Sequence, residues 1–180
     1  MEHAELLDTA GRLFYRRGVR AVGMDDVRAA SGVSLKRLYQ CFPSKEALVV
    51  AYLERRDERW MSSLTGHVTT AGGDPVEAVF AWLERWFGED DFRGCGFLNA
   101  YGELGASSEA VSEVVRRHKD RLRAFLRGLT AGARDPDLLA EQLLVLIDGA
   151  TVTAMLNPPG TEAARAARET ARVLTAACRA

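Results

Sequence analysis

The chain has 180 residues, of which 47% are hydrophobic and 27% are charged, a composition typical of a soluble globular protein with one large or two small domains. Its three cysteines, Cys41, Cys95 and Cys178, are odd in number and far apart, which argues against a disulfide framework and favours a reducing compartment. The first residues lack the pattern of a signal peptide, and no apolar run approaches the roughly 20 residues of a membrane span. We therefore expect a cytoplasmic protein that does not enter a membrane.

Charge is distributed unevenly along the chain. The net charge is −1, but residues 11–45 contain eight basic and two acidic residues, a net charge of +6, so the remainder carries −7. A basic end on an acidic body fits the neutralisation of phosphate groups at that end. The alternative for this segment alone is a solvated charged face.

The N-terminal region has the pattern of three helices. Apolar residues at helical spacing predict a first helix over 2–17, which Gly18 ends. Between 24 and 45, Gly32 interrupts a helical pattern and Ser34 is a good N-cap for the next short helix. The core expected for this region is Leu13, Phe14, Val27, Ala30, Val33, Leu38 and Phe42.

The second short helix has one apolar and one polar side. Leu38 and Phe42 are four residues apart and share a face. The side chains left on the outer side are Lys36, Arg37, Tyr39 and Gln40. A helix, a glycine-containing turn and a second helix with a polar outer face form the pattern of a helix-turn-helix, whose second helix enters the DNA major groove.

The rest of the chain is also helical in pattern, with neither a β-hairpin signal nor an internal repeat. Helices are expected over 44–64, 75–88, 95–104, 108–129 and 138–156 and from 161 onward, with a loop over 68–74. The 54–59 stretch reads as solvated. The expected inner face of the last helix is Ala163, Ala166, Ala167, Thr170, Val173, Leu174 and Ala177. The sequence therefore predicts an all-α protein of about nine helices.

The exact residues of the helix-turn-helix segment indicate a particular protein family, which the helical pattern alone does not. The segment GVSLKRLYQCFPSKEAL resembles the DNA-binding signature of the TetR family of bacterial regulators. The resemblance implies a helix-turn-helix domain over 1–47 and a helical effector-binding and dimerisation domain over 48–180. It also implies a homodimer that binds double-stranded DNA at a palindromic operator, with the last two helices paired across a two-fold axis, and a small-molecule effector. The alternative for these two helices is burial within the monomer.

Six residues are the expected DNA contacts. Arg37 is expected to read a base and Lys36 to contact a base or a phosphate, although the resembled family usually has other residues at both positions. Tyr39 and Lys45 match positions that contact phosphate in that family. Ser34 and Gln40 complete the expected set, and capping is a sufficient explanation for Ser34.

A ligand pocket is expected in the second domain, because an apolar cavity with a few polar groups suits a small molecule. The residues expected to line it are Trp60, Phe80, Trp82, Trp86, Phe97, Asn99, Tyr101, His118, Phe125 and Met155. For each of them the alternative is an ordinary core position. His118 and Asp148 in particular lie on apolar stripes and fit either a satisfied core residue or a ligand contact.

Other chemistries have little support in the sequence. No catalytic motif, cofactor or metal site is expected, since His3, His67 and His118 are isolated from one another. Cys95 follows Arg93 and Gly94, so a thiol sensor is one hypothesis for it and a small buried hydrophobe is the other. The function expected is a ligand-responsive transcriptional repressor. The alternative is a helix-turn-helix protein without a small-molecule effector, regulated by a protein partner or by cysteine oxidation.

Overall fold

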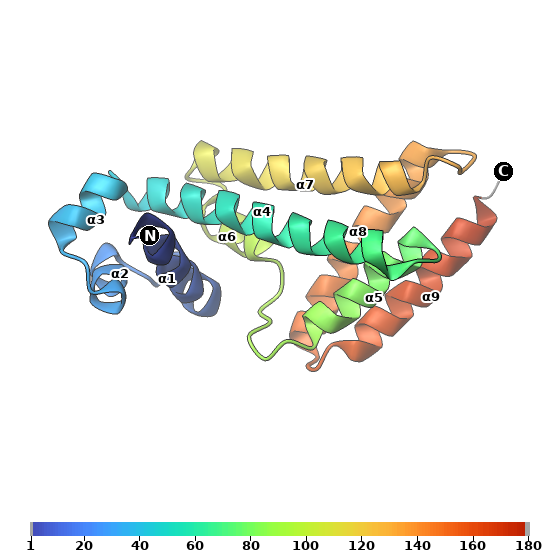
Figure 1. The fold of residues 1–180 in the computed structure, drawn as a ribbon, viewed down its shortest axis with the longest axis horizontal. Coiled ribbons are helices and arrows are strands. Elements are labelled where there is room, and N and C mark those ends of the chain that lie inside the picture. The colour runs from blue at the N-terminus through green and yellow to red at the C-terminus, as the bar shows by residue number, and fades with distance from the viewer. Residues whose placement is uncertain (1, 179–180) are drawn as a thin grey trace. The chain divides into compact units, whose positions relative to one another are not determined.

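The computed structural model describes residues 2–178, and this part of the chain forms nine α-helices and no β-strand. The helices are α1 (Glu2–Arg17), α2 (Met24–Ser31), α3 (Leu35–Cys41), α4 (Lys45–Ala71), α5 (Pro75–Phe87), α6 (Gly96–Leu104), α7 (Glu109–Leu129), α8 (Pro136–Leu156) and α9 (Thr161–Ala177) (Figure 1). The all-α fold expected from the sequence is confirmed.

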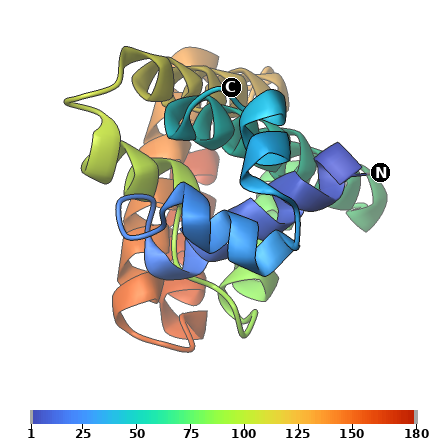
Figure 2. The same ribbon diagram turned by 90° about the vertical axis from the view of Figure 1, so that its left-hand side faces the viewer.

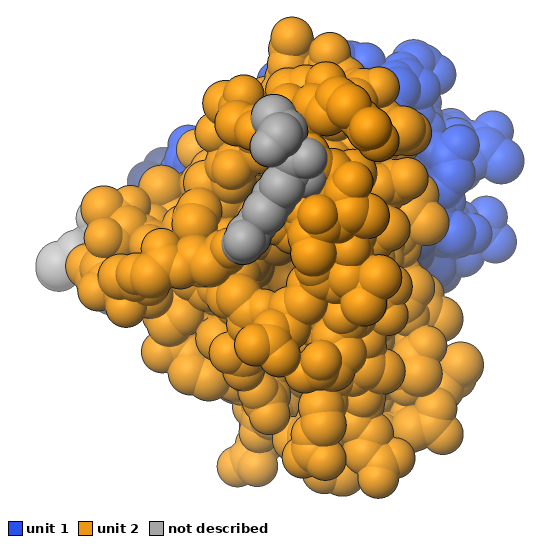
Figure 3. Space-filling model, turned by 90° about the vertical axis from the view of Figure 1, so that its right-hand side faces the viewer, with its two compact units in different colours: residues 1–59, 96–118 blue, residues 60–95, 119–180 orange. Residues whose placement is uncertain are grey.

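The chain divides into two compact units, coloured separately in Figure 3. The first unit comprises residues 1–59 and 96–118, and the second comprises residues 60–95 and 119–180. Helices α4 and α7 each contribute residues to both units, so the units are not consecutive stretches of sequence. The expected functional division at residue 47 is a different kind of boundary and stays a prediction.

In the first unit, α1 packs against α2, and α2 packs against α3 (Figure 2). Of the core expected here, Phe14, Val27, Leu38 and Phe42 are buried. Ala30 is exposed, and Leu13 and Val33 are only half-buried, so that part of the expected core was wrong. Leu6 and Ala10 of α1 are buried, as their helical spacing indicates, and Leu7, Val19 and Val22 complete the core.

Helix α4 is longer than its sequence pattern indicated. It was expected to end near residue 64 but continues to Ala71. The hydroxyl groups of Thr69 and Thr70 donate to main-chain carbonyl oxygens one turn earlier, at 2.8 and 2.9 Å. Both hydroxyl groups therefore find their hydrogen-bond partners within the helix. Gly72 and Gly73 then adopt positive φ angles of 67° and 74°, which end the helix. Only residues 72–74 remain of the expected 68–74 loop.

In the second unit, α9 packs against both α5 and α8. Its buried residues are Ala164, Ala167 and Ala171, small side chains that let the helices approach closely. Four members of the expected inner face, namely Ala166, Thr170, Val173 and Ala177, are exposed instead. Ala167 is buried as expected, and Ala163 and Leu174 pack against the core. An alanine-rich helix has little contrast between its faces, so its sequence indicated the buried side only in part.

Helix α8 is long and apolar enough, by length and composition alone, to cross a membrane, which corrects the expectation that nothing in the chain approaches such a span. One helix of this kind is weak support for a membrane protein. Eight of its residues are buried among the other residues of the second unit. That arrangement is the one found in a core helix of a globular domain.

Candidate DNA-binding surface and ligand sites

The turn between α2 and α3 is built by two local signals. Gly32 adopts φ 72° in the left-handed region, and its N–H donates to the carbonyl oxygen of Arg28, which closes α2. Ser34 then caps α3, since its hydroxyl oxygen accepts the N–H of Arg37 at 3.2 Å. Both features were expected from the sequence, and together they fix the short connection between the two helices.

Helix α3 buries the side chain of Leu38 and exposes most of its other side chains. Leu38 is fully buried, and Phe42, which caps the C-terminus of the helix, is 4% exposed. The exposed side chains include Ser34 and four others from the expected DNA-contact set, namely Lys36, Arg37, Tyr39 and Gln40. The structure therefore gathers five of the six expected residues on the outer side of one short helix and its cap.

The first turn of α2 is held by Asp26. One of its carboxylate oxygens accepts the N–H of Gly23 at 2.8 Å, and the other lies 3.2 Å from the guanidinium group of Arg17. The Gly23 hydrogen bond and, after it, the Arg17 contact hold the pKa of Asp26 below its usual value. This capping ties the last turn of α1 to the first turn of α2.

Lys45, the sixth expected DNA contact, is the first residue of α4 and is half-buried. Its ammonium group donates to the carbonyl oxygen of Arg20, in the α1–α2 loop, at 3.3 Å. It therefore lies beside the α1–α2 loop. Its expected contact with phosphate stays a prediction.

One residue that touches this region was missed from the sequence. The carboxylate of Glu103, in α6, accepts the N–H of Val19 at 3.0 Å and that of Arg20 at 2.6 Å. The contact joins residues 84 and 83 positions apart, so no local pattern could have indicated it. A glutamate at the end of a short, otherwise mostly apolar helix was the only available signal.

The ten residues expected to line a ligand pocket are divided between the units. The six in the second unit are Trp60, Phe80, Trp82, Trp86, Phe125 and Met155. The four in the first unit are Phe97, Asn99, Tyr101 and His118. The three tryptophans pack together, with Trp60 edge-on to Trp82 at 4.9 Å and to Trp86 at 5.7 Å between ring centroids. The Trp82 indole donates to the Ser63 hydroxyl at 3.1 Å. Trp82 and Trp86 are buried in the core of the second unit, and Trp60 is partly buried against it.

The four residues in the first unit differ in exposure. His118 is 3% exposed, and Phe97 stacks on its ring, while Tyr101 is 50% exposed. Asn99 is half-buried. The Nδ1 atom of His118 lies 2.6 Å from the Asp57 carboxylate, so this histidine is a core residue with a partner. Asp148, the other open case, forms an ion pair with Lys119 of α7.

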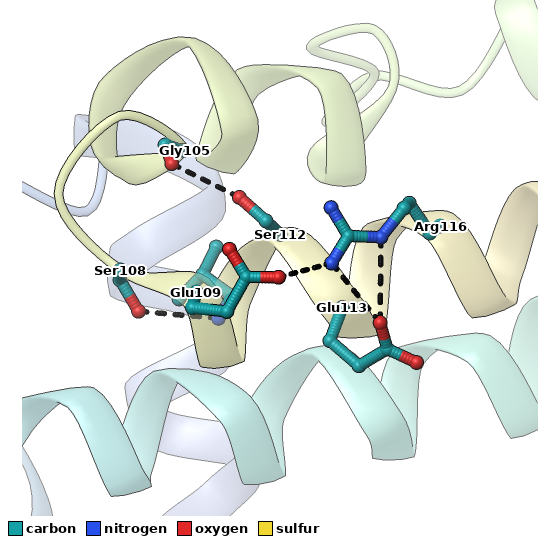
Figure 4. Close-up of polar contacts among 7 residues, drawn as sticks. Gly105, Ser108, Glu109, Ser112, Glu113 and Arg116 are labelled. Atoms are coloured by element: carbon teal, nitrogen blue, oxygen red, sulfur yellow. Dashed lines mark hydrogen bonds and ion pairs between the residues drawn. The ribbon is translucent and has the colours of Figure 1, made fainter.

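The start of α7 carries a further set of polar contacts in the first unit (Figure 4). Ser108 caps the helix, since its hydroxyl oxygen accepts the N–H of Val111 at 3.1 Å. About two turns further along α7, Arg116 pairs with Glu109 and with Glu113, the latter at 3.1 Å. These three side chains are more than half exposed, so their ion pairs contribute little to stability.

A cleft of about 720 Å³ opens in the second unit. It lies between the end of α4, the first turns of α5 and the C-terminal half of α9, and none of the ten expected residues lines it. The Glu77 carboxylate in its wall accepts from Arg168 Nε at 2.7 Å and lies 2.8 Å from Arg172 Nε. Thr175, also in the wall, has a buried hydroxyl oxygen with no hydrogen-bond partner among the described residues. The volume is in the range that holds a small molecule.

Cysteine and metal chemistry have limited structural support. Cys41, Cys95 and Cys178 are all half-buried and unpaired. Arg93, the basic residue near Cys95, donates to the main-chain carbonyls of Asp90 and Phe92 at 3.3 and 2.6 Å. Over residues 2–178, no three His, Cys, Asp or Glu side chains gather where they could hold a metal ion.

Comparison with known families settles the class of protein. Residues 6–52 match the family of bacterial regulatory proteins named after TetR, and residues 75–179 match the C-terminal domain of BetI-type transcriptional repressors. The second match alone covers more than half of the chain. The chain belongs to the TetR family. TetR-family proteins are DNA-binding transcriptional regulators and not enzymes, so the helix-turn-helix read from the sequence is confirmed.

Individual TetR-family proteins are similar over most of their length. An uncharacterized HTH-type regulator of Mycobacterium tuberculosis is 43% identical over 162 residues, which are 88% of this chain and 76% of that protein. EthR of Mycolicibacterium smegmatis is 26% identical over 126 residues, and the match spans only 52% of EthR. The crystal structure of SCO4454 from Streptomyces coelicolor, at 26% identity, superposes with a TM-score of 0.91 over 99% of this chain and 96% of that one.

Proposed function

We propose that this TetR-family protein is a homodimeric repressor that leaves a palindromic operator when a small molecule binds to it. The observation that carries the proposal is the capped turn between α2 and α3, which leaves a basic, polar helix face exposed. Lys36 and Arg37 on that face are suited to guanine edges in the major groove. Tyr39, Gln40, Ser34 and Lys45 are proposed to contact phosphate or neighbouring bases and so to set the register.

Dimerisation is supported by an apolar stripe on α8. Its exposed members are Leu138, Val145, Val152 and Leu156, which recur every four to seven residues along one side of the helix. On α9, Val173 is 68% exposed, and it shares an exposed face with Ala166, Thr170 and Ala177. Covering these side chains with the same surface of a second copy would form a four-helix interface. Two recognition helices roughly 34 Å apart would then read two half-sites.

An effector is proposed to bind in the second unit and to lower operator affinity. The effector needs only a different affinity for the operator-binding and the released states. A coupling free energy of about 1–3 kcal/mol would weaken operator binding roughly 5- to 150-fold. The expected aromatic residues of that unit are one candidate site, namely Trp60, Phe80, Trp82, Trp86 and Phe125. The cleft walled by Glu77, Arg168 and Arg172 is a second one, because charged and apolar side chains both line it, whereas the tryptophans are closely packed.

The sign of regulation and the location complete the proposal. Among similar proteins, ComR of Escherichia coli is named as a repressor and FasR of Mycolicibacterium smegmatis as an activator. We propose repression because the C-terminal match is to BetI-type repressors. The site of action is proposed to be the cytoplasm, where the DNA lies.

The test is a footprinting and binding experiment with the purified protein on the DNA upstream of its own gene. The proposal expects protection of a two-fold symmetric site by two protomers and release of that site by one member of a panel of small molecules. If a symmetric site is protected but no small molecule releases it, the alternative regulated by a protein partner or by oxidation of Cys95 is favoured. Protection of no site at all would refute the proposal.

A further inference from the structure

The loop between α1 and α2 (residues 18–23) is held by a carboxylate that belongs to a distant part of the chain. Glu103, the second-last residue of α6, accepts the N–H of Val19 on one carboxylate oxygen and the N–H of Arg20 on the other, at 3.0 and 2.6 Å. Hydrogen bonds from N–H groups to an ionised carboxylate are shorter and stronger than those between neutral groups. α1, α2 and α6 all lie in the first unit.

The backbone of the loop is shaped to receive this carboxylate. Gly18 adopts φ 86°, in the left-handed region, and successive N–H groups after such a residue form a concave site for an anion. A Cβ atom at position 18 would lie 3.0 and 3.2 Å from the two carboxylate oxygens of Glu103. Glycine is therefore required twice, once for the φ angle and once for the space.

The same loop residue is held from a second side. The carbonyl oxygen of Arg20 accepts from Lys45 Nζ at 3.3 Å, while its N–H donates to Glu103. Lys45 is the first residue of α4, close to where α3 ends. Both main-chain polar groups of Arg20 are thus satisfied by side chains of opposite charge, one from α6 and one from α4.

We infer that Glu103 is a positioning residue for operator binding, acting through the α1–α2 loop on Lys45 and on the helix-turn-helix. The inference rests on the proposed function, because it concerns the binding of an operator. With the carboxylate in place, the loop has one conformation, and Lys45 and the first turn of α2 keep fixed positions. Without it, the two N–H groups lose their partner and the loop samples other conformations. Sequence-specific binding depends on this register, whereas non-specific binding depends mainly on net positive charge.

The test compares Glu103→Gln with Glu103→Asp and with a matched control, Glu113→Gln. Glu113 is in the same unit, is exposed, and undergoes the same chemical change (Figure 4). For Glu103→Gln we expect operator affinity to fall about tenfold, the loss typical of a hydrogen bond to a charged group. Affinity for a scrambled duplex at low salt should not fall, because the net charge becomes less negative. Glu103→Asp keeps the charge and should recover part of the operator affinity, while Glu113→Gln should change neither affinity.

A spectroscopic readout tests the contact itself, whether or not DNA is present. In Glu103→Gln, the backbone amide protons of Val19 and Arg20 should shift upfield and exchange faster with solvent, and in Glu113→Gln they should not. Unchanged amide signals, or equal losses of specific and non-specific affinity, would contradict the inference. Equal losses of operator affinity and of scrambled-duplex affinity would indicate that the variant is merely destabilised. If the wild-type protein itself binds no operator, the proposed function is refuted instead.

A second variant keeps the inference testable if Glu103→Gln folds poorly. Gly18→Ala places a methyl group against the Glu103 carboxylate and should also weaken operator binding. The double variant Gly18→Ala/Glu103→Ala should lose less affinity than the sum of the losses in the single variants Gly18→Ala and Glu103→Ala, because both act on the same contact. Additive losses would show that the two residues act separately and would overturn the inference.

Discussion

The Nδ1 atom of His118 lies 2.6 Å from a carboxylate oxygen of Asp57, and the ring of Phe97 stacks on the imidazole with 3.6 Å between centroids. The three residues come from α7, α4 and α6, so one buried cluster ties three helices of the first unit together. A buried polar group is tolerated when it is hydrogen-bonded, and His118 satisfies that condition. The structure thus assigns to His118 the role of a core residue with a polar partner.

Replacement of His118 should therefore lower stability. His118→Ala removes the ring that Phe97 packs on and leaves the half-buried Asp57 without this partner, so we expect the free energy of unfolding to fall by about 2–4 kcal/mol. His67→Ala, at a partly exposed position near the end of α4, should change it by less than about 0.5 kcal/mol. Urea unfolding of both variants measures the difference, and equal effects would contradict the structural role.

Stability should also depend on Asp8 at acid pH. Hydrogen bonds from Arg55 and then from Arg59 lower the pKa of Asp8 from 3.8 to about 2. Because the folded-state value is the lower one, the stabilisation is fully present above pH 3.8 and is lost as the pH falls toward 2. After allowance for solvent screening, it amounts to about 1–2 kcal/mol.

Asp8→Asn should remove that dependence. Its free energy of unfolding should be lower than that of the wild type at pH 6, and the two should converge near pH 2. Asp120→Asn, which breaks a mostly exposed pair with Arg123, is the control and should have little effect at either pH. Parallel pH profiles for Asp8→Asn and the wild type would show that the ion pair has no such role.

Arg37 is the side chain we expect to read a base. Arg37→Ala should weaken operator binding about 5- to 150-fold and relax the preference at one base pair in each half-site, as the loss of a bidentate contact to guanine does. Arg127→Ala removes the same charge from an exposed position in the second unit and should leave operator binding unchanged. Competition with operators altered one base pair at a time measures both effects. An Arg37→Ala protein with wild-type preference would show that another residue reads the operator.

The exposed stripe of α8 should be the dimer interface. Val152 is 43% exposed, and Val152→Glu would place a charge in an apolar contact, so the protein should sediment as a 19.7 kDa monomer and lose operator affinity. Ala131→Glu, in the exposed turn after α7, should leave the dimer intact. Analytical ultracentrifugation decides between the two states. A Val152→Glu dimer would place the interface elsewhere.

The features that were predicted correctly from sequence depend on neighbouring residues. Gly32 and Ser34 define the turn before α3, and the expected start of α5 at residue 75 agrees with the structure, because capping and backbone geometry act over a few positions. The end of α4 was predicted too early because Thr69 and Thr70, which are poor helix formers, remain in the helix. Their hydroxyl groups donate to main-chain carbonyl oxygens of the same helix.

The features that were missed depend on contacts between residues far apart in the chain. Asp57 was read as part of a solvated stretch, yet its partner His118 is 61 positions away. Glu77 and Arg168 in the wall of the cleft are 91 positions apart. The expected ligand residues were chosen by chemical type, and nothing in a single sequence indicates that four of the ten belong to a different compact unit from the other six. Packing between distant helices decides such placements, and it leaves no periodic signal.

The measurement that tests the central claim most directly is the affinity of the wild-type protein for the DNA upstream of its own gene, compared with a scrambled duplex over a range of salt concentrations. The account predicts tight binding of a dimer to one symmetric site, with a preference for that site that persists as salt weakens both affinities. Equal affinities for the two duplexes that fall together with salt would mean that α3 reads no sequence and that the basic N-terminal region binds only by charge.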